Sequence, residues 1–174
     1  WTNLPQPRLK FDLYPQIAGV LQADARALPL TSNSITSIMF DPPFVVGSRA
    51  DGKPGIMKTR FGYYKTIPML WSFYTDALTE FARILKANGI IAFKCQDTVS
   101  GGINYLSHVK VVTIAQQLNL YVKDLFILGR GSVMWSPNMV NQQHARKNHC
   151  YYVILEKRAR EQANPGVASM LTGD

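Results

Sequence analysis

The sequence predicts an α/β fold in which a mostly parallel sheet carries helices on both faces. Short β-branched, apolar runs alternate along the chain with segments of helical periodicity. These runs are almost continuously apolar, which is typical of strands that are buried on both faces. Two long polar connections follow strands, and in such sheets the functional loops lie at the carboxyl ends of the strands.

The expected elements follow one another in a regular order. A first helix begins near Pro68, because proline suits the first helical position. Apolar residues then recur three and four positions apart as far as Leu85, and Asn88-Gly89 is expected to end the helix. A second helix is expected over residues 108–118. Strands are expected at 8–13, 19–23, 34–41, 89–95, 121–128 and 149–156.

Length and composition indicate one globular domain. The chain has 174 residues, 47% of them apolar and 17% charged. We expect a domain over residues 1–160 and a C-terminal tail over 161–174. No apolar run is long enough to span a bilayer, and the first residues do not form a signal peptide. The single cysteines Cys95 and Cys150 lie in apolar runs, which indicates buried thiols and a reducing, intracellular setting. We expect a cytoplasmic protein from a bacterial or phage-like setting.

The charge of the chain is concentrated in two segments. The net charge is +8, and residues 46–65 and 144–160 each carry five basic residues against one acidic residue. Such clusters favour a polyanionic partner, although a solvated basic surface explains them equally well.

The most informative segment is Asp41-Pro42-Pro43-Phe44, which follows the β-branched run at 34–40. An acid is therefore expected at the carboxyl end of a buried strand. Two prolines fix φ twice and remove two backbone donors, so the turn is stiff and its carbonyls are free to accept hydrogen bonds. An acceptor cluster beside an aromatic ring suits a planar amino group. Taken singly, Asp41 could instead cap a turn, and Phe44 could belong to the core.

The tetrapeptide resembles motif IV of the class I, S-adenosylmethionine-dependent amino-methyltransferases, which act on adenine N6 or cytosine N4, mostly in DNA. Residues 23–30 with Asn33-Ser34 resemble that family's acidic turn after its third strand, and residues 9–15 resemble its second strand. The three matches cover the first quarter of the chain. They imply a Rossmann-like class I methyltransferase fold, with the final strand antiparallel beside its predecessor.

The resemblance also implies roles for individual residues. The Asp41 carboxylate and the Pro42 carbonyl would accept hydrogen bonds from the base amine, on a turn stiffened by Pro43, and Phe44 would stack on the extruded base. The cofactor would be S-adenosylmethionine, and no metal is implied. Its ribose would be held by Asp12, and its adenine by Asp24 and the backbone of Ala25. The simpler interpretations are a solvated acid for Asp12 and a helix N-cap for Asp24.

Basic and aromatic residues in the two long connections suggest contacts with nucleic acid. The 45–67 connection suits phosphate neutralisation and base stacking, or a lid over the site. Residues 93–97 with Gly101-Gly102 resemble the family's segment that lines the target pocket. Within it, Lys94 would reach a phosphate or a carboxylate such as Asp41, or extend into solvent. The segment before the last strand suits phosphate contacts, or is a plain surface loop. The expected contacts are Lys58, Arg60, Tyr63, Lys94, Arg146 and Lys147.

One motif of the family has no counterpart here. Its glycine-rich turn after the first strand would hold the methionine part of the cofactor, and nothing before Leu9 resembles it. We therefore expect that strand and turn to lie upstream of Trp1. No separate target-recognition domain is evident, so specificity would come from the long loops, a missing region or a second subunit.

The favoured function is methylation of adenine N6 in DNA, with no membrane partner. The alternatives are cytosine N4 in DNA and base amines in RNA. A non-catalytic nucleic-acid-binding subunit and a small-molecule amine methyltransferase are further alternatives.

Overall fold

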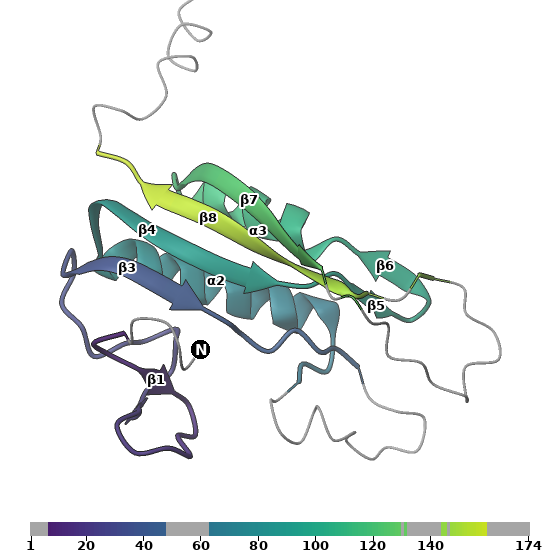
Figure 1. Cartoon of the computed structure of the whole chain (residues 1–174), viewed down its shortest axis with the longest axis horizontal. Coiled ribbons are helices and arrows are strands. Elements are labelled where there is room, and N and C mark those ends of the chain that lie inside the picture. The colour runs from purple at the N-terminus through teal and green to yellow at the C-terminus, as the bar shows by residue number, and fades with distance from the viewer. Residues whose placement is uncertain (1–6, 48–62, 130, 132–143, 146, 160–174) are drawn as a thin grey trace, which may run out of the picture.

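The computed structural model describes residues 7–47, 63–129, 131, 144–145 and 147–159. Its centre is a four-stranded sheet, in which β4 pairs in parallel with β3 and antiparallel with β8, and β8 also pairs antiparallel with β7 (Figure 1). In spatial order the strands are β3 (Ile35–Phe40), β4 (Leu85–Cys95), β8 (His149–Lys157) and β7 (Tyr121–Gly129).

The position of the last strand confirms one expectation and qualifies another. As expected, β8 is antiparallel and lies beside its predecessor β7. The sheet is less parallel than predicted, because both pairings of β8 are antiparallel and only the β3–β4 pairing is parallel. The strands β3, β4 and β7 still run in the same direction.

Two smaller sheets flank the central one. The strands β1 (Phe11–Asp12) and β2 (Leu21–Gln22) pair in parallel near the amino end of the chain. The strands β5 (Thr98–Ser100) and β6 (Ile103–Tyr105) form an antiparallel hairpin that the sequence analysis did not predict. Its turn uses Gly101 and Gly102 at φ of +58° and +75°, a conformation that glycine adopts without strain.

Both described helices lie on the same face of the central sheet (Figure 1). They are α2 (Ile67–Ile84) and α3 (Ser107–Gln117). At the start of α2, the Thr66 hydroxyl accepts a hydrogen bond from the Met69 amide, and a proline occupies the first turn as predicted. Helices were predicted on both faces. Among the described residues only one face is covered in this way.

The end of the first helix was predicted incorrectly. α2 ends at Ile84, and Leu85 already belongs to β4, four residues before Gly89. It is Asn88 that adopts a left-handed conformation, with φ of +61°. A Cβ atom at Gly89 would lie 2.6 Å from the Leu85 Cγ, so the glycine provides space for a buried leucine.

The core lies between the sheet and the two helices, and a cluster of aromatic rings joins them. Phe93 of β4 makes edge-to-face contacts with Phe40 of β3 and with Tyr74 of α2, at centroid distances of 5.2 and 5.0 Å. Phe40 makes a further edge contact with Phe81, at 4.8 Å. Such contacts stabilise beyond area burial alone. They also pin the last residue of β3, immediately before the Asp41 turn.

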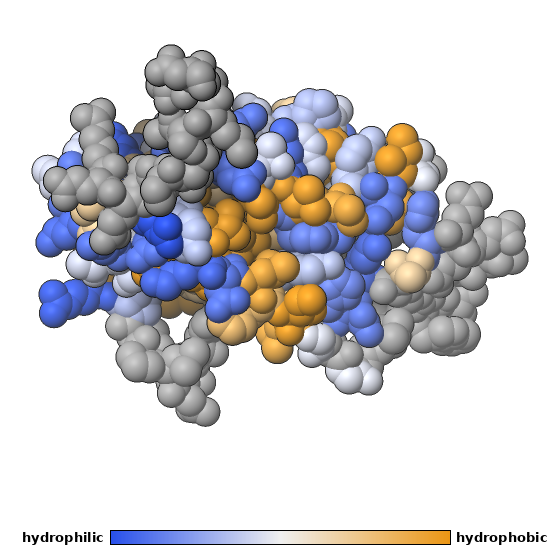
Figure 2. All heavy atoms as spheres, turned by 90° about the horizontal axis from the view of Figure 1, so that it is seen from above, coloured by the Kyte–Doolittle hydropathy of each residue, from blue (hydrophilic) through white to orange (hydrophobic). Residues whose placement is uncertain are grey.

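The outer strand β7 exposes large hydrophobic side chains over Leu125–Leu128. Seen from above Figure 1, where β7 is uppermost, hydrophobic side chains gather in a band across the molecule (Figure 2). No helix in the described part of the chain combines the length and hydrophobicity of a membrane span.

Replacing Phe93 by alanine should lower the free energy of unfolding by about 3–5 kcal/mol, the usual cost of truncating a buried phenylalanine. Urea denaturation measures this change. The control is Met39→Ala on β3, where the side chain is exposed and the expected change is within about 0.5 kcal/mol. Equal losses for the two variants would contradict the core described above.

Candidate functional site

The Asp41-Pro42-Pro43-Phe44 turn lies at the carboxyl end of β3, as predicted. Pro42 is buried, whereas Pro43 and Phe44 are half-buried. The Asp41 side chain retains 40% of its exposure. The turn is therefore anchored by its first proline and presents the carboxylate at the surface, where a ligand can reach it.

The Asp41 carboxylate is paired with Lys94, which extends from the next strand, β4. The Lys94 Nζ lies 2.6 Å from the Asp41 Oδ2, and the lysine side chain is 21% exposed. Partial burial acts to lower the pKa of Lys94, but the hydrogen bond and the charge of Asp41 outweigh it and raise that pKa. The ammonium thus stays charged at neutral pH and holds one oxygen of the carboxylate. Of the three positions foreseen for Lys94, the structure shows the contact with a carboxylate.

The connection that follows the Asp41 turn ends close to where it begins. The Gly47 amide donates a hydrogen bond to the Tyr64 carbonyl, and the Tyr64 amide donates to the Val45 carbonyl, both at 2.9 Å. This pairing brings the far end of the connection back beside the Asp41 turn. It also places the exposed Tyr63 there. Lys58 and Arg60 lie outside the described residues, as does Arg146 further along the chain.

The two acids expected to hold a cofactor lie at the ends of adjacent parallel strands. Asp12 is the last residue of β1, and Asp24 comes two residues after β2. Asp12 is exposed, and its Oδ1 accepts a hydrogen bond from the Tyr14 amide at 2.7 Å. Both oxygens of Asp24 accept hydrogen bonds from the Arg26 guanidinium, at 2.6–3.1 Å. These bonds lower the pKa of Asp24, although partial burial opposes them. The adjacent Ala25 packs against the core.

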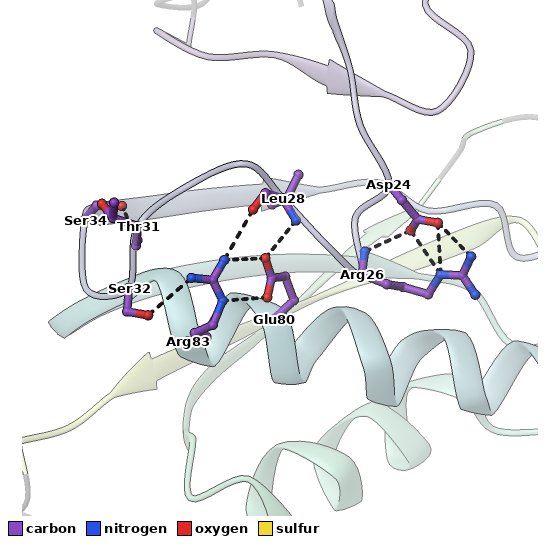
Figure 3. A network of polar contacts seen from close by, with 8 residues as sticks. All are labelled: Asp24, Arg26, Leu28, Thr31, Ser32, Ser34, Glu80 and Arg83. Carbon is purple, nitrogen blue, oxygen red and sulfur yellow. Dashed lines mark hydrogen bonds and ion pairs between the residues drawn. The ribbon is translucent and has the colours of Figure 1, made fainter.

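The segment from Asp24 to Ser34 is fastened to α2 by hydrogen bonds to the Glu80–Arg83 ion pair of that helix (Figure 3). Arg83 Nη2 lies 2.6 Å from Glu80 Oε1, and the same oxygen accepts a hydrogen bond from the Leu28 amide at 2.7 Å. Arg83 also donates to the Leu28 carbonyl and to the Ser32 hydroxyl. Glu80 and Arg83 thus hold the acidic turn in place against the helix.

An open hollow of about 520 Å³ lies between this segment and α2. Charged side chains dominate its wall, and the residues of the Asp41 turn are not among those that line it. It therefore lies apart from the acceptor cluster. The lining residues are Asp24, Arg26, Ala27, Asp76, Thr79 and Glu80.

Lys147 precedes β8, and its backbone is held by a residue that the sequence analysis did not assign. The Gln96 amide donates hydrogen bonds to the Lys147 carbonyl at 3.4 Å and to the His149 carbonyl at 2.7 Å. Gln96 lies more than 50 positions earlier in the sequence. Two signals pointed to its segment, namely its place directly after a buried strand and the resemblance of residues 93–97 to the family's target-pocket lining, but neither gave Gln96 a role. No group of three or more potential metal ligands occurs in the described part of the chain.

Comparison with known proteins identifies the fold. No family model and no curated protein sequence matches the chain. Among solved structures, a Thermus thermophilus protein assigned as a DNA modification methylase, in complex with S-adenosyl-L-methionine, superposes with a TM-score of 0.55 at 15% identity. That match covers 78% of this chain and 54% of the other.

The cytosine-N4-specific PvuII DNA methyltransferase also superposes with a TM-score of 0.55, at 16% identity, over 80% of this chain and 48% of the enzyme. The chain thus spans about half the length of these structures. At this level of identity the likeness shows a shared fold, and that fold is the one found in DNA methyltransferases.

Removing the Glu80 charge with Glu80→Gln should destabilise the protein by about 1–3 kcal/mol at neutral pH, the cost of losing hydrogen bonds to a charged group. The bonds from Arg83, reinforced by the Leu28 amide, lower the pKa of Glu80 despite partial burial. Their contribution is therefore complete above the ordinary glutamate pKa and disappears as the pH falls through the lowered value.

Thermal unfolding of both proteins across the acid range measures this dependence. The wild type and Glu80→Gln should differ at pH 7 and converge in acid. Asp76→Asn, on the same helix, is the matched control and should change little, because the Asp76 carboxylate accepts a long hydrogen bond of 3.5 Å from Ser72 and acts on Arg26 through its charge alone. A difference between wild type and Glu80→Gln that persists in strong acid would contradict the assigned ion pair.

Proposed function

We propose that the protein is an S-adenosylmethionine-dependent methyltransferase that acts on an exocyclic base amine of nucleic acid, with adenine N6 in DNA as the favoured target. The observation that carries this proposal is the exposed Asp41 carboxylate at the carboxyl end of β3, in a fold shared with DNA methyltransferases. In α/β sheets this edge of the sheet is the usual ligand site.

Methyl transfer requires that the lone pair of the base amine be directed at the methyl group, and it does not require that the amine be deprotonated beforehand. The lone pair of such an amine is delocalised into the ring, so hydrogen-bond acceptors must draw the nitrogen towards tetrahedral geometry. Lys94 holds the Asp41 Oδ2, which leaves the Oδ1 to accept one amine hydrogen. The Pro42 carbonyl accepts the other hydrogen, and Phe44 stacks against the extruded base. Rigid placement supplies most of the rate gain.

The described residues fit S-adenosylmethionine in part. Asp12 is an exposed carboxylate at a strand end, with one oxygen engaged by the Tyr14 amide, and it suits the ribose hydroxyls. Asp24 suits the adenine amine only when Arg26 gives up one of its two oxygens. When bound, the cofactor supplies an electrophilic methyl group. The chain's own residues would bind it and orient the amine.

A second candidate is methylation of cytosine N4 in DNA, which the likeness to the PvuII enzyme favours. Both targets are planar amines that the same acceptors would recognise. The test is to incubate the protein with DNA and S-adenosylmethionine labelled in its methyl group. The DNA is then digested to nucleosides, and the modified nucleoside is identified. Label in N6-methyl-2′-deoxyadenosine supports the favoured target, and label in N4-methyl-2′-deoxycytidine supports the alternative. Label in neither rejects both.

Asp41→Asn should lower kcat by about 10²–10³-fold, the usual effect of losing one preorganised hydrogen-bond partner of a transition state. The affinity for S-adenosylmethionine should stay within about twofold of the wild type, since Asp41 is assigned to the target base and not to the cofactor. Single-turnover methylation and calorimetry measure the two quantities. Wild-type turnover in Asp41→Asn would remove the basis of the proposal.

Lys94→Gln should lower kcat by about 10–100-fold, because Asp41 loses the contact that orients it and misplaced catalytic groups carry penalties of this size. The matched control is Lys123→Gln, which removes an exposed pair with Glu156 on β8 and should leave turnover unchanged. Steady-state kinetics on the same DNA substrate compare the two variants. Equal effects would show that Lys94 acts only through the overall charge.

A further inference from the structure

A buried acid that the proposed chemistry does not use lies just beyond β4. The Asp97 side chain is 4% exposed and is contacted from two other elements. The His108 Nδ1, at the start of α3, lies 2.8 Å from its Oδ1. The Tyr151 hydroxyl, on β8, donates a hydrogen bond to its Oδ2 over 3.4 Å. The His108 ring also stacks on the Tyr151 ring, at a centroid distance of 4.0 Å.

These contacts extend to a second histidine in a defined direction. A hydroxyl has one hydrogen, so with that hydrogen directed at Asp97 the Tyr151 oxygen accepts from the His149 Nε2, 2.9 Å away, in the tautomer that carries the proton on Nε2. Burial first, and then the charge of Asp97, raise the pKa of Tyr151, which therefore keeps its proton at neutral pH. The hydrogen bonds of His108, Tyr151 and His149 thus form one network that ends at the Asp97 carboxylate. The charge of that carboxylate also adds to the effect of burial in raising the pKa of the nearby Cys95 thiol.

The same corner holds the chain that leads into β8. The His144 Nε2 lies 2.7 Å from the Gly102 carbonyl in the β5–β6 turn. At the other end of this segment, Gln96 bonds to the carbonyls of Lys147 and His149. His144 at one end, and Lys147 and His149 at the other, are therefore fastened to the 96–102 segment, and Lys147 is itself one of the attachment points.

This corner lies at the same end of the sheet as the Asp41 turn. β8 is antiparallel, so it begins where β4 ends, and Tyr151 pairs in register with Cys95. The neighbouring Lys94 bonds to Asp41. A nucleic-acid strand that delivers a base to Asp41 would pass close to Lys147, and a lysine beside a polyanion neutralises phosphate.

We propose that Asp97, His108, Tyr151 and His149 are positioning residues that hold the described residues 147–149 at the edge of the site, so that Lys147 contacts the phosphodiester backbone beside the target base. This inference rests on the proposed function. The network acts on the binding of nucleic acid and not on methyl transfer itself.

Tyr151→Phe tests the network while keeping the ring that stacks on His108. It should raise the Kd and KM for an oligonucleotide by about 2–10-fold, the effect of one or two lost hydrogen bonds, with kcat within about twofold of the wild type. Tyr121→Phe is the matched control on the same sheet and should change neither, because its exposed ring contacts Arg158 at the opposite end of β7. A fall in kcat with unchanged KM would overturn the assignment.

A double-mutant cycle separates positioning from general stability. Lys147→Gln should lower the slope of log Kd against log salt by about 0.9, the value for one phosphate contact on duplex DNA. Combined with Tyr151→Phe, its effect should be less than additive, since both variants remove the same contact. Additive effects would show that Tyr151 does not act through Lys147. The His149 pair gives independent evidence: His149→Leu should weaken binding, and His149→Gln, which keeps a donor for Tyr151, should restore it.

Amide hydrogen exchange tests the positioning role without any need for catalysis. Exchange over residues 147–149 should accelerate in Tyr151→Phe and not in Tyr121→Phe, and unchanged exchange would overturn the inference whatever the activity. Anisotropy with a labelled oligonucleotide needs no turnover. If the wild type binds DNA but transfers no methyl group, the proposed function fails while the positioning role is still measured by Kd and exchange.

Discussion

The packing of Phe93 against Phe40 and Tyr74 is the constraint on which the rest of the structure depends. It joins β3, β4 and α2 through rings that leave little freedom in the core. Because Phe40 is the last residue of β3, this packing determines where the chain leaves the sheet and where Asp41 begins. Lys94, the residue after Phe93, points to the other face and meets the acid. A hydrophobic contact on one face thus sets a polar contact on the other.

Local patterns predicted the parts of the fold that depend on periodicity. The strand at 34–41, the helix beginning near Pro68 and the last strand at 149–156 all agree with the structure to within a few residues. The antiparallel course of that last strand was implied by the family resemblance and not by periodicity. The helix end was missed, because Asn88-Gly89 is a typical helix stop and the reason for the glycine is a packing contact with Leu85. The β5–β6 hairpin was also missed, since three-residue strands carry too little alternation to be recognised.

The candidate site was predictable where chemistry is concentrated in adjacent residues, and not where it is assembled from distant ones. Asp41 and its prolines form a continuous motif. Gln96, by contrast, meets its partners more than 50 residues later, and nothing in either segment alone specifies that contact. The pairing of Asp24 with Arg26 shows a third situation. A nearby cation can form an ion pair with a carboxylate that a motif assigns to ligand binding, and only the three-dimensional structure reveals that ion pair.

The antiparallel course of β8 has a consequence for how such a protein can diversify. Gly129, at the end of β7, stands opposite His149, at the start of β8, so the chain departs and returns at one point of the sheet. Any sequence grafted between these two residues would start and finish at the edge of the sheet that carries Asp41, without altering a strand. Under the proposed function, evolution or engineering could therefore change the target preference by replacing this one segment, leaving the aromatic core and the acid it positions untouched.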